Sequence, residues 1–206
     1  MALRLRRVSQ IVFLLVFTAL IILGKAQLWM GIFLISVAAA MFWGRFYCGW
    51  ICPINTLTEG IDKIYKKLNI NRRAVPNWAK SPYLKYLILL LFLGTMVFVL
   101  KTGHKLPVLP TLLMLGIVTT LIFVPAFWHK YLCPYGAIMS MTGRHSKHYW
   151  IIEQEDCIKC GKCKAVCPGE AVELNSPKDY PAISKKLCLQ CASCVIACPK
   201  HTIKYQ

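Results

Sequence analysis

Four long stretches of the chain are almost entirely apolar, and they come in two pairs. Each pair is two apolar stretches joined by a short turn: Val8 to Gly24 with Leu28 to Trp43, and Tyr83 to Leu100 with Pro107 to Trp128. Each stretch approaches the helix length that a bilayer crossing requires. Four such runs as buried core helices would leave no polar surface for a water-soluble domain. The pattern therefore predicts four transmembrane helices.

Segment 44–82, between the two pairs, places apolar residues at helical spacing and charged residues on the other faces. The apolar positions are Leu57, Ile61, Ile64, Tyr65 and Leu68. This pattern predicts an amphipathic helix, capped by Asn55 or Thr56, whose apolar stripe lies at the membrane surface or against a partner. In the last apolar stretch, Pro125 predicts a kink.

The pattern changes after residue 135. Residues 136–148 are mostly polar and include two glycines, which predicts a linker, and residues 149–206 hold only short apolar runs. These runs predict two strand pairs: Tyr149 to Ile152 with Thr202 to Tyr205, and Val172 to Leu174 with Pro181 to Ile183. The predicted fold class is a membrane all-α domain of four transmembrane helices over residues 1–135, plus a small α+β domain.

The net charge of +17 is unevenly distributed. Thirteen basic residues lie in the N-terminal segment, in segment 44–82 and in residues 129–148, which follow the fourth apolar stretch, whereas the two opposite turns hold three, Lys25, Lys101 and Lys105. This asymmetry is the positive-inside signature, and it argues against nucleic acid as the partner. It predicts a multi-pass protein of the cytoplasmic membrane, with both termini, segment 44–82 and the C-terminal domain in the cytoplasm.

Eight of the eleven cysteines form two runs of identical spacing, 31 residues apart. The runs are Cys157-x2-Cys160-x2-Cys163-x3-Cys167-Pro and Cys188-x2-Cys191-x2-Cys194-x3-Cys198-Pro. Such runs bind [4Fe–4S] clusters, and in two-cluster ferredoxins the fourth cysteine ligates the other cluster. Zinc ribbons instead use separated C-x2-C pairs. The spacing predicts a two-cluster bacterial-type ferredoxin domain, with one cluster on Cys157, Cys160, Cys163 and Cys198 and the other on Cys188, Cys191, Cys194 and Cys167.

A weaker repeat lies where the second and fourth apolar stretches end. Cys52-Pro53 aligns with Cys133-Pro134, and Cys48 aligns with His129. If the two stretches are neighbours, Cys48, Cys52, His129 and Cys133 form a Cys3His set, suited to an additional iron–sulfur cluster or zinc ion. The alternative is a packing or redox-thiol role at the helix ends, and the sequence leaves both open.

Together these features resemble the NapH/NosR-type membrane polyferredoxins, which are typified by the membrane quinol dehydrogenase subunit of periplasmic nitrate reductase systems. The resemblance implies that Cys48 and Cys52 match the first Cys-x3-Cys-Pro motif of the family and Cys133 the second cysteine of its second motif. His129 stands where the family has a cysteine. The resemblance also implies that a hydroquinone is oxidised in the membrane and that its electrons enter a relay.

The expected function is an electron-transfer subunit of a quinol-linked oxidoreductase complex, with other redox subunits as partners. One alternative is a conduit from a soluble ferredoxin or flavoprotein, without a quinone site. Another is a metal-handling or assembly factor in which Cys48, Cys52 and Cys133 are the active part. Candidate proton-accepting groups are His104, His129, Glu59 and Asp62, although each also fits an ordinary surface role.

Overall fold

The computed structural model describes residues 2–102, 107–174, 176 and 179–206. The turn that carries His104 and Lys105 lies outside the described residues. The chain forms two compact units, Met1–Cys52 with Met139–Gln206 and Pro53–Ile138. The predicted boundaries of the membrane and ferredoxin domains stay a prediction.

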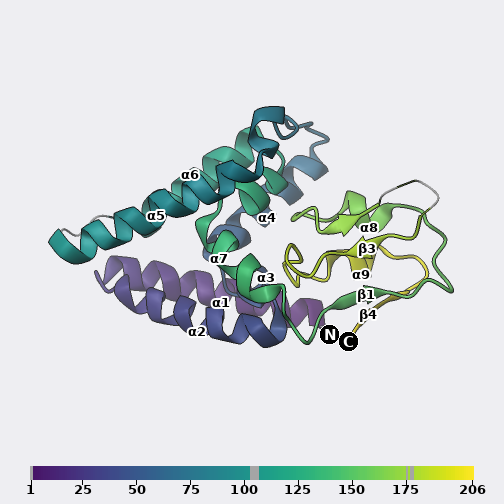
Figure 1. Cartoon of the computed structure of the whole chain (residues 1–206), viewed down its shortest axis with the longest axis horizontal. Helices are drawn as coiled ribbons and strands as arrows, with labels where there is room; N and C mark the ends of the chain where they lie inside the picture. Colours follow the sequence, from purple (N-terminus) through teal and green to yellow (C-terminus); the bar gives the residue numbers. More distant parts are fainter. Residues whose placement is uncertain (1, 103–106, 175, 177–178) are drawn as a thin grey trace. The chain divides into compact units, whose positions relative to one another are not determined.

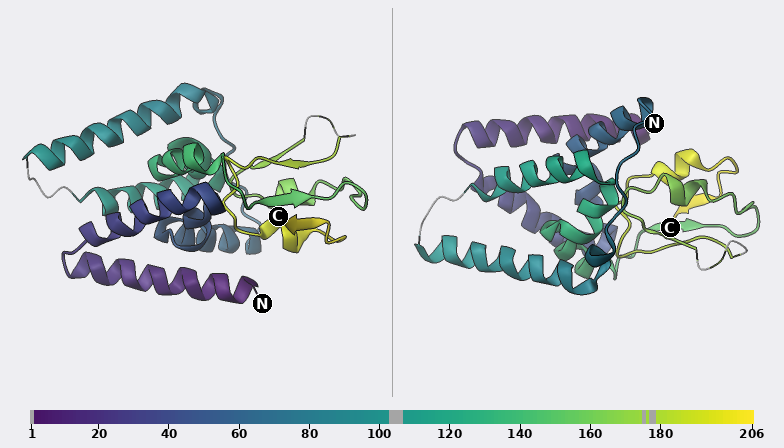
Figure 2. Two further views of the ribbon diagram at one scale, coloured as in Figure 1. Left: turned by 60° about the horizontal axis from the view of Figure 1, so that its bottom comes forward. Right: turned by 90° about the horizontal axis from the view of Figure 1, so that it is seen from above.

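The first unit begins with a helical hairpin. Helices α1 (Ala2–Ile22) and α2 (Gln27–Trp43) lie side by side, as Figures 1 and 2 show. The Trp29 indole packs edge-on against Phe17, with 5.0 Å between ring centroids, and donates a hydrogen bond of 2.9 Å to the Tyr47 hydroxyl. Tyr47 belongs to the short helix α3 (Phe46–Trp50), which follows directly after the hairpin.

The C-terminal part of this unit is built on two small antiparallel strand pairs. Strand β1 (Trp150–Ile152) pairs with β4 (Ile203–Tyr205), and β2 (Val172–Glu173) pairs with β3 (Ala182–Ile183). Both predicted pairings are thereby confirmed. Two short helices, α8 (Lys162–Ala165) and α9 (Ser193–Ala197), contact each other. The core between them is small, with Cys163, Val172, Cys194 and Ile203 as its buried members.

The second unit contains α4 (Pro53–Lys67), the 3-10 helix η1 (Asn77–Lys80), α5 (Pro82–Thr102), α6 (Val108–Ile122), the π-helix η2 (Phe127–Leu132) and the start of α7 (Pro134–Gly143). Helix α4 packs against α6 at Gly116, where a Cβ would collide with Ile54. Arg72 donates a hydrogen bond of 3.1 Å to the Thr120 carbonyl and forms a salt bridge with Asp62. The charges of segment 44–82 are therefore partly paired within the unit.

Helix α4 differs from its prediction in two ways. It begins at Pro53, before the predicted caps, because proline fits the first helical position, where no amide hydrogen bond is needed. Its buried face is Ile54, Asn55, Thr58 and Asp62, while Ile64 and Leu68 of the predicted apolar stripe are exposed. The other three positions of the stripe, Leu57, Ile61 and Tyr65, are partly exposed, and its contact with a membrane surface or a partner stays a prediction.

The fourth apolar stretch is not one helix. Helix α6 ends at Ile122, and Phe123 has extended backbone. The backbone of Arg73 then pairs with this break, since Arg73 N donates to Ile122 O and Val124 N donates to Arg73 O, both at 3.1 Å. The feature predicted as a kink at Pro125 is thus a full interruption stabilised by a distant segment.

Residues 136–143 of the predicted linker are helical, because α7 continues to Gly143, and the role of 136–148 as a linker between domains stays a prediction. Pro134 begins this helix at a position that favours proline, and Ala137 and Met139 are buried. Burial of these two side chains outweighs the polar residues around them.

Within the described ranges, one helix segment, Arg4–Ile22, is both long and apolar enough to cross a membrane. Three shorter apolar helices occupy Gln27–Trp43, Tyr83–Val99 and Val108–Ile122. Four apolar helices are therefore present at the predicted places, and their role as four membrane spans stays a prediction.

Candidate metal centres

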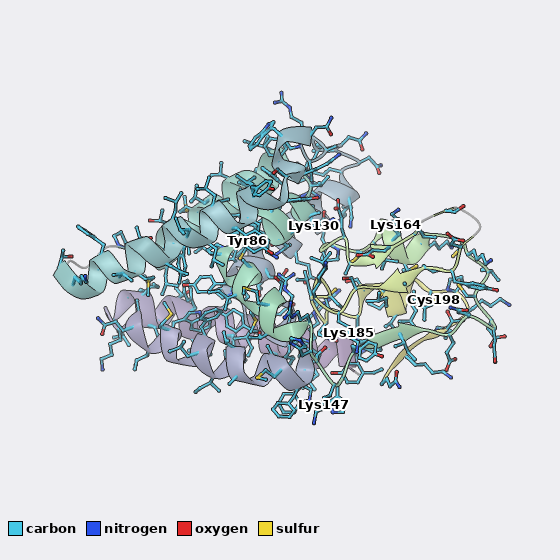
Figure 3. The ribbon with its side chains drawn as sticks, in the orientation of Figure 1. Tyr86, Lys130, Lys147, Lys164, Lys185 and Cys198 are labelled. Carbon is cyan, nitrogen blue, oxygen red and sulfur yellow. The ribbon has the colours of Figure 1, made fainter. Side chains whose placement is uncertain are left out.

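Two cavities in the C-terminal part of the first unit are each lined by four cysteines. The first cavity is lined by Cys157, Cys160, Cys163 and Cys198. The second is lined by Cys167, Cys188, Cys191 and Cys194. Each cavity thus receives three cysteines from one run and the fourth from the other run. Figure 3 labels Cys198, which directly follows α9.

The two cysteine runs share the same unusual backbone. Positive φ angles recur at positions 31 residues apart: Lys159 (54°) and Gln190 (56°), Gly161 (72°) and Ala192 (56°), Glu170 (47°) and His201 (52°). For residues other than glycine this conformation is costly, and it persists where the surroundings impose it, commonly at functional sites. The repetition shows that the two runs form equivalent loops.

Hydrogen bonds reach several of the thiols. The Ala171 amide donates to Cys167 Sγ at 3.2 Å, and the Cys191 thiol lies 3.4 Å from the Ser193 hydroxyl, to which it donates. The Thr202 hydroxyl lies 3.4 Å from Cys198 Sγ. Such contacts to sulfur are among the groups that set the potential of a bound cluster.

The two cavities differ in exposure. In the first, Cys160 is exposed and Cys157 and Cys198 are partly exposed, whereas Cys188, Cys191 and Cys194 of the second are buried. Burial raises the pKa of the Cys188 thiol to about 12 and also raises the pKa of Cys194. Without metal, these thiols are therefore protonated at neutral pH, and metal binding must release their protons.

Three further cysteines show pKa shifts in both directions. Burial raises the pKa of Cys163 and of Cys167. For Cys198, desolvation is the largest single influence and raises the pKa, but hydrogen bonds from the Thr202 side chain and from the following backbone amides together lower it. Of Cys163, Cys167 and Cys198, Cys198 is therefore the thiol that ionises most easily.

Two buried arginines from the helical hairpin region contact the loop of the second cavity. Arg6 donates to the Cys191 carbonyl at 2.8 Å and to the Gly49 carbonyl at 3.0 Å. Arg45, only 1% exposed, donates to the Leu187 carbonyl at 3.4 Å, and its charge lowers the pKa of Cys188, although burial outweighs this effect. The distribution of basic residues predicted only that Arg6 and Arg45 lie beside the membrane, and it did not predict their contacts with this loop. The position of Arg45 between the end of α2 and the aromatic Cys-x3-Cys-Pro motif was the available signal for a special role.

Helix α3 also contacts this loop. The Trp50 indole donates to the Gln190 carbonyl at 3.1 Å. At Gly49 a Cβ would collide with the Leu189 carbonyl oxygen, so only glycine allows the loop to approach this closely. The second cavity is therefore held against α1 and α3 by polar contacts to its backbone.

The members of the Cys3His set are all buried, and each has a local neighbour. Cys48 Sγ lies 3.9 Å from Arg45 Nη2 and 4.0 Å from Met139 Sδ. His129 Nε2 lies 3.4 Å from the Thr58 hydroxyl, and the Gly136 amide donates to Cys133 Sγ at 3.3 Å. Cys48 and Cys52 belong to the first compact unit, and His129 and Cys133 belong to the second. Over the ranges that the structure describes, no three His, Cys, Asp or Glu side chains are grouped to hold a single metal ion.

The donor set of the two cavities fits [4Fe–4S] clusters. Four thiols surround each cavity, with no carboxylate or imidazole in either lining. All-thiolate sets are those that hold cubane clusters, whose four irons spread the ligands farther apart than a single ion would.

Comparison with known proteins agrees with this chemistry. Residues 156–203 match the family described as a 4Fe–4S dicluster domain. Residues 26–71 and residues 106–151 each match the family described as a 4Fe–4S binding domain. The weak repeat of the helical region therefore coincides with two matches to one family. No solved structure matches the chain.

Three relatives illustrate the similarity. YccM of Escherichia coli, a candidate electron transport protein, is 30% identical over 145 residues, which are 59% of this chain and 41% of YccM. The ferredoxin-type protein NapH of Haemophilus influenzae is 28% identical over 167 residues, 71% of this chain and 55% of NapH. The regulatory protein NosR of Stutzerimonas stutzeri is 26% identical over 161 residues, 66% of this chain and 22% of NosR. The chain thus spans about half or less of the length of these relatives.

The domain matches define the chain as an iron–sulfur protein of the 4Fe–4S class. NosR and NapH are among its relatives, in agreement with the resemblance to NapH/NosR-type proteins that the sequence motifs predicted.

Proposed function

We propose that this chain is the membrane-anchored electron-transfer subunit of a quinol-linked oxidoreductase complex. The observation that carries the proposal is the pair of four-cysteine cavities in one small fold, attached to the N-terminal helices by Arg6 and Arg45. In this proposal the four apolar helices span the cytoplasmic membrane. Both termini and the cysteine-rich part then lie on the cytoplasmic side, because the basic residues gather there.

The cysteines would divide between two clusters as the cavities divide them. Cys157, Cys160, Cys163 and Cys198 would hold one cluster, and Cys167, Cys188, Cys191 and Cys194 the other. A bound [4Fe–4S] cluster supplies one-electron transfer. Oxidation of a hydroquinone to a quinone releases two electrons and two protons, so two one-electron centres match the stoichiometry of one hydroquinone.

The difference in exposure between the two cavities indicates which one would face the membrane and which one would face a partner protein. The buried second cavity lies against α1 and α3, whose residues would be close to membrane-soluble carriers. The first cavity presents Cys160 at the surface, where a further redox subunit could approach. The other redox proteins of the complex are therefore expected to dock on the side of the first cavity.

Two measurements on the purified complex test this function. Iron and acid-labile sulfide should each amount to about eight per chain, the content of two four-iron clusters. Addition of a quinol should reduce the clusters and bleach their visible absorbance. Zinc in place of iron would contradict the cluster assignment. Reduction by a soluble ferredoxin or flavoprotein, with no response to quinol, would favour a conduit without a quinone site.

The Cys3His set is proposed as an additional metal or cluster site on one specific observation. Both of its halves, Cys48 with Cys52 and His129 with Cys133, fall inside the two matches to the 4Fe–4S binding domain. Iron clearly above eight per chain, reduced by Cys48→Ser without change in the dicluster EPR signal, would support it. If Cys48→Ser leaves the iron content at its wild-type value, the set binds no iron.

A further inference from the structure

The two cysteine loops have the same spacing and the same backbone, but their surroundings differ. Leu189 of the second loop is 2% exposed, whereas Ile158, its counterpart 31 residues earlier, is 57% exposed. Helix α3 covers the second loop, since the Trp50 indole donates to the Gln190 carbonyl and Gly49 lies against the Leu189 carbonyl. The corresponding part of the first loop is exposed.

The charges of the two loops also differ. Between its first and last cysteine, the first run contains three lysines and no acidic residue, whereas the second run contains no charged residue. The lysines are Lys159, Lys162 and Lys164, and all three are exposed. Their counterparts in the second run are Gln190, Ser193 and Val195. The exposed loop therefore carries positive charge that its covered counterpart lacks.

Part of this charge lies at the first cavity itself. Lys159 and Lys200 are among the residues that line it. The Lys159 ammonium lies 3.8 Å from the centroid of the Tyr180 ring, and this cation–π contact holds it in place. Cys160, the exposed one among the four cysteines of this cavity, lies in the same loop. A cluster bound there would be reached from outside beside fixed positive charge.

The carboxylates that precede the loop act on a different lysine. The Glu153 carboxylate forms a salt bridge of 2.8 Å with Lys204 of β4 and raises the pKa of that lysine, and the charge of Asp156 adds to the effect. None of residues 153–156 lines the first cavity. This negative charge is therefore drawn to β4.

We propose that residues 157–164 and Lys200 form a docking surface for an electron-transfer protein that is acidic around its own redox centre. The docking surface rests on the proposed function, whose relay it supplies with a partner of defined surface chemistry. Opposite charges steer two such proteins together, and the exposed Ile158 adds an apolar contact. A lipid headgroup or a nucleic acid would need neither this apolar residue nor an exposed cluster ligand.

The test measures electron transfer to the full-length, cluster-loaded protein in neutral detergent by stopped-flow absorbance. The probe is the hydroquinone form of flavodoxin, a small acidic flavoprotein. Its anionic flavin gives one electron to the oxidised cluster and becomes the neutral semiquinone, so no proton moves. With the wild type, the rate constant should fall at least tenfold as the ionic strength rises from roughly 0.01 M to 1 M, because salt screens the attraction.

Reversal of the loop's charge should slow this reaction. Lys162→Glu combined with Lys164→Glu changes two residues outside the lining of the cavity, and at low salt the rate constant should fall about tenfold. The matched control is Arg144→Glu combined with Lys147→Glu, which changes the net charge equally at two exposed positions. Figure 3 labels Lys164 and Lys147, which lie well apart on this unit. The control should react within about twofold of the wild-type rate.

Two further measurements accompany each variant. The visible spectrum confirms that the clusters are retained, and redox titration followed by EPR gives their midpoint potentials. Equal slowing by both double variants would show that net charge, and not this surface, controls the rate, and it would overturn the proposal. A wild-type rate that does not depend on salt would overturn it too. So would a slower rate that a lowered midpoint potential explains in full.

The outcomes separate the docking surface from the proposed function. If quinol bleaches the clusters but flavodoxin reacts independently of salt and of both lysines, the docking surface is wrong and the quinol-linked function stands. If the reaction with flavodoxin shows the expected salt dependence and quinol bleaches nothing, the docking surface stands and the quinol-linked function fails.

Discussion

At the scale of single residues, the buried arginines Arg6 and Arg45 connect the helical region to the chemistry of the second cavity. Each guanidinium satisfies backbone carbonyls that the loop would otherwise bury unpaired. Each also places a fixed positive charge beside thiols that become negative when they bind metal. Positive charge near a cluster favours its reduced form, so both residues should raise the potential of a bound cluster.

Arg45→Gln should therefore lower the midpoint potential of the centre in the second cavity. The expected shift is roughly 60 mV, which is the tenfold step of a one-electron couple. Redox titration followed by EPR measures it. Arg45→Lys, which keeps the charge, should shift the potential far less, and Arg144→Gln, at an exposed position, should not shift it. An equal shift in all three variants would show that the effect is not electrostatic.

The crosswise sharing of cysteines can be tested by serine substitutions. Because Cys198 lines the first cavity and Cys167 the second, Cys198→Ser should alter the same EPR signal as Cys157→Ser. Cys167→Ser should alter the signal that Cys188→Ser alters. The opposite pairing, with Cys198→Ser and Cys188→Ser affecting one signal, would mean that each run holds its own cluster.

At the scale of secondary-structure elements, the sequence pattern located a helix or strand wherever the spacing of nearby side chains determines it. The antiparallel strand pairs and the apolar helices follow from the spacing of side chains, and the sequence located them. The end of α6 at Ile122 could not be found this way, because it depends on backbone pairing with Arg73, about fifty residues earlier in the chain. The eight dicluster cysteines were evident from their spacing, whereas the burial of Arg6 and Arg45 depends on tertiary contacts that a charge pattern does not encode.

The close approach of α3 to the second-cavity loop should make Gly49 intolerant of a side chain. Gly49→Ala forces a Cβ against the Leu189 carbonyl, and such overpacking typically costs about 1–3 kcal/mol. We expect clusters to be lost at a lower temperature, which visible absorbance during heating measures. The control is Gly31→Ala in α2, where a Cβ would meet nothing within 4 Å. Equal melting of both variants would show that the α3 contact does not stabilise the loop.

At the scale of the whole molecule, the chemistry is concentrated in one compact unit. The first unit contains both cysteine cavities and the buried arginines Arg6 and Arg45. The second unit contributes α4 to α6, with the exposed Ile64 and Leu68 as an apolar surface. The two cysteine cavities can therefore be studied by substitutions in the first unit alone.

The small core of the C-terminal part makes its fold depend on bound clusters. Its buried members include Cys163 and Cys194, so the metal ligands are also core residues. Burial raises the pKa of Cys188 to about 12 and raises those of Cys163, Cys167 and Cys194, so all four carry protons at neutral pH when metal is absent. Cluster binding then releases protons, and protons compete with iron more strongly as the pH falls.

Acidification should therefore remove the clusters first and unfold the C-terminal part with them, while the helices of the N-terminal hairpin remain. Under anaerobic conditions, cluster absorbance should decay faster at pH 5 than at pH 8. Limited proteolysis should then cut within residues 149–206 while α1 and α2, whose contacts include the Trp29–Phe17 pair, stay intact. Faster decay at pH 8 than at pH 5 would reverse the sign expected from protonated thiols. Loss of absorbance without new cleavage sites would show instead that the strand pairs hold this part of the chain together without metal.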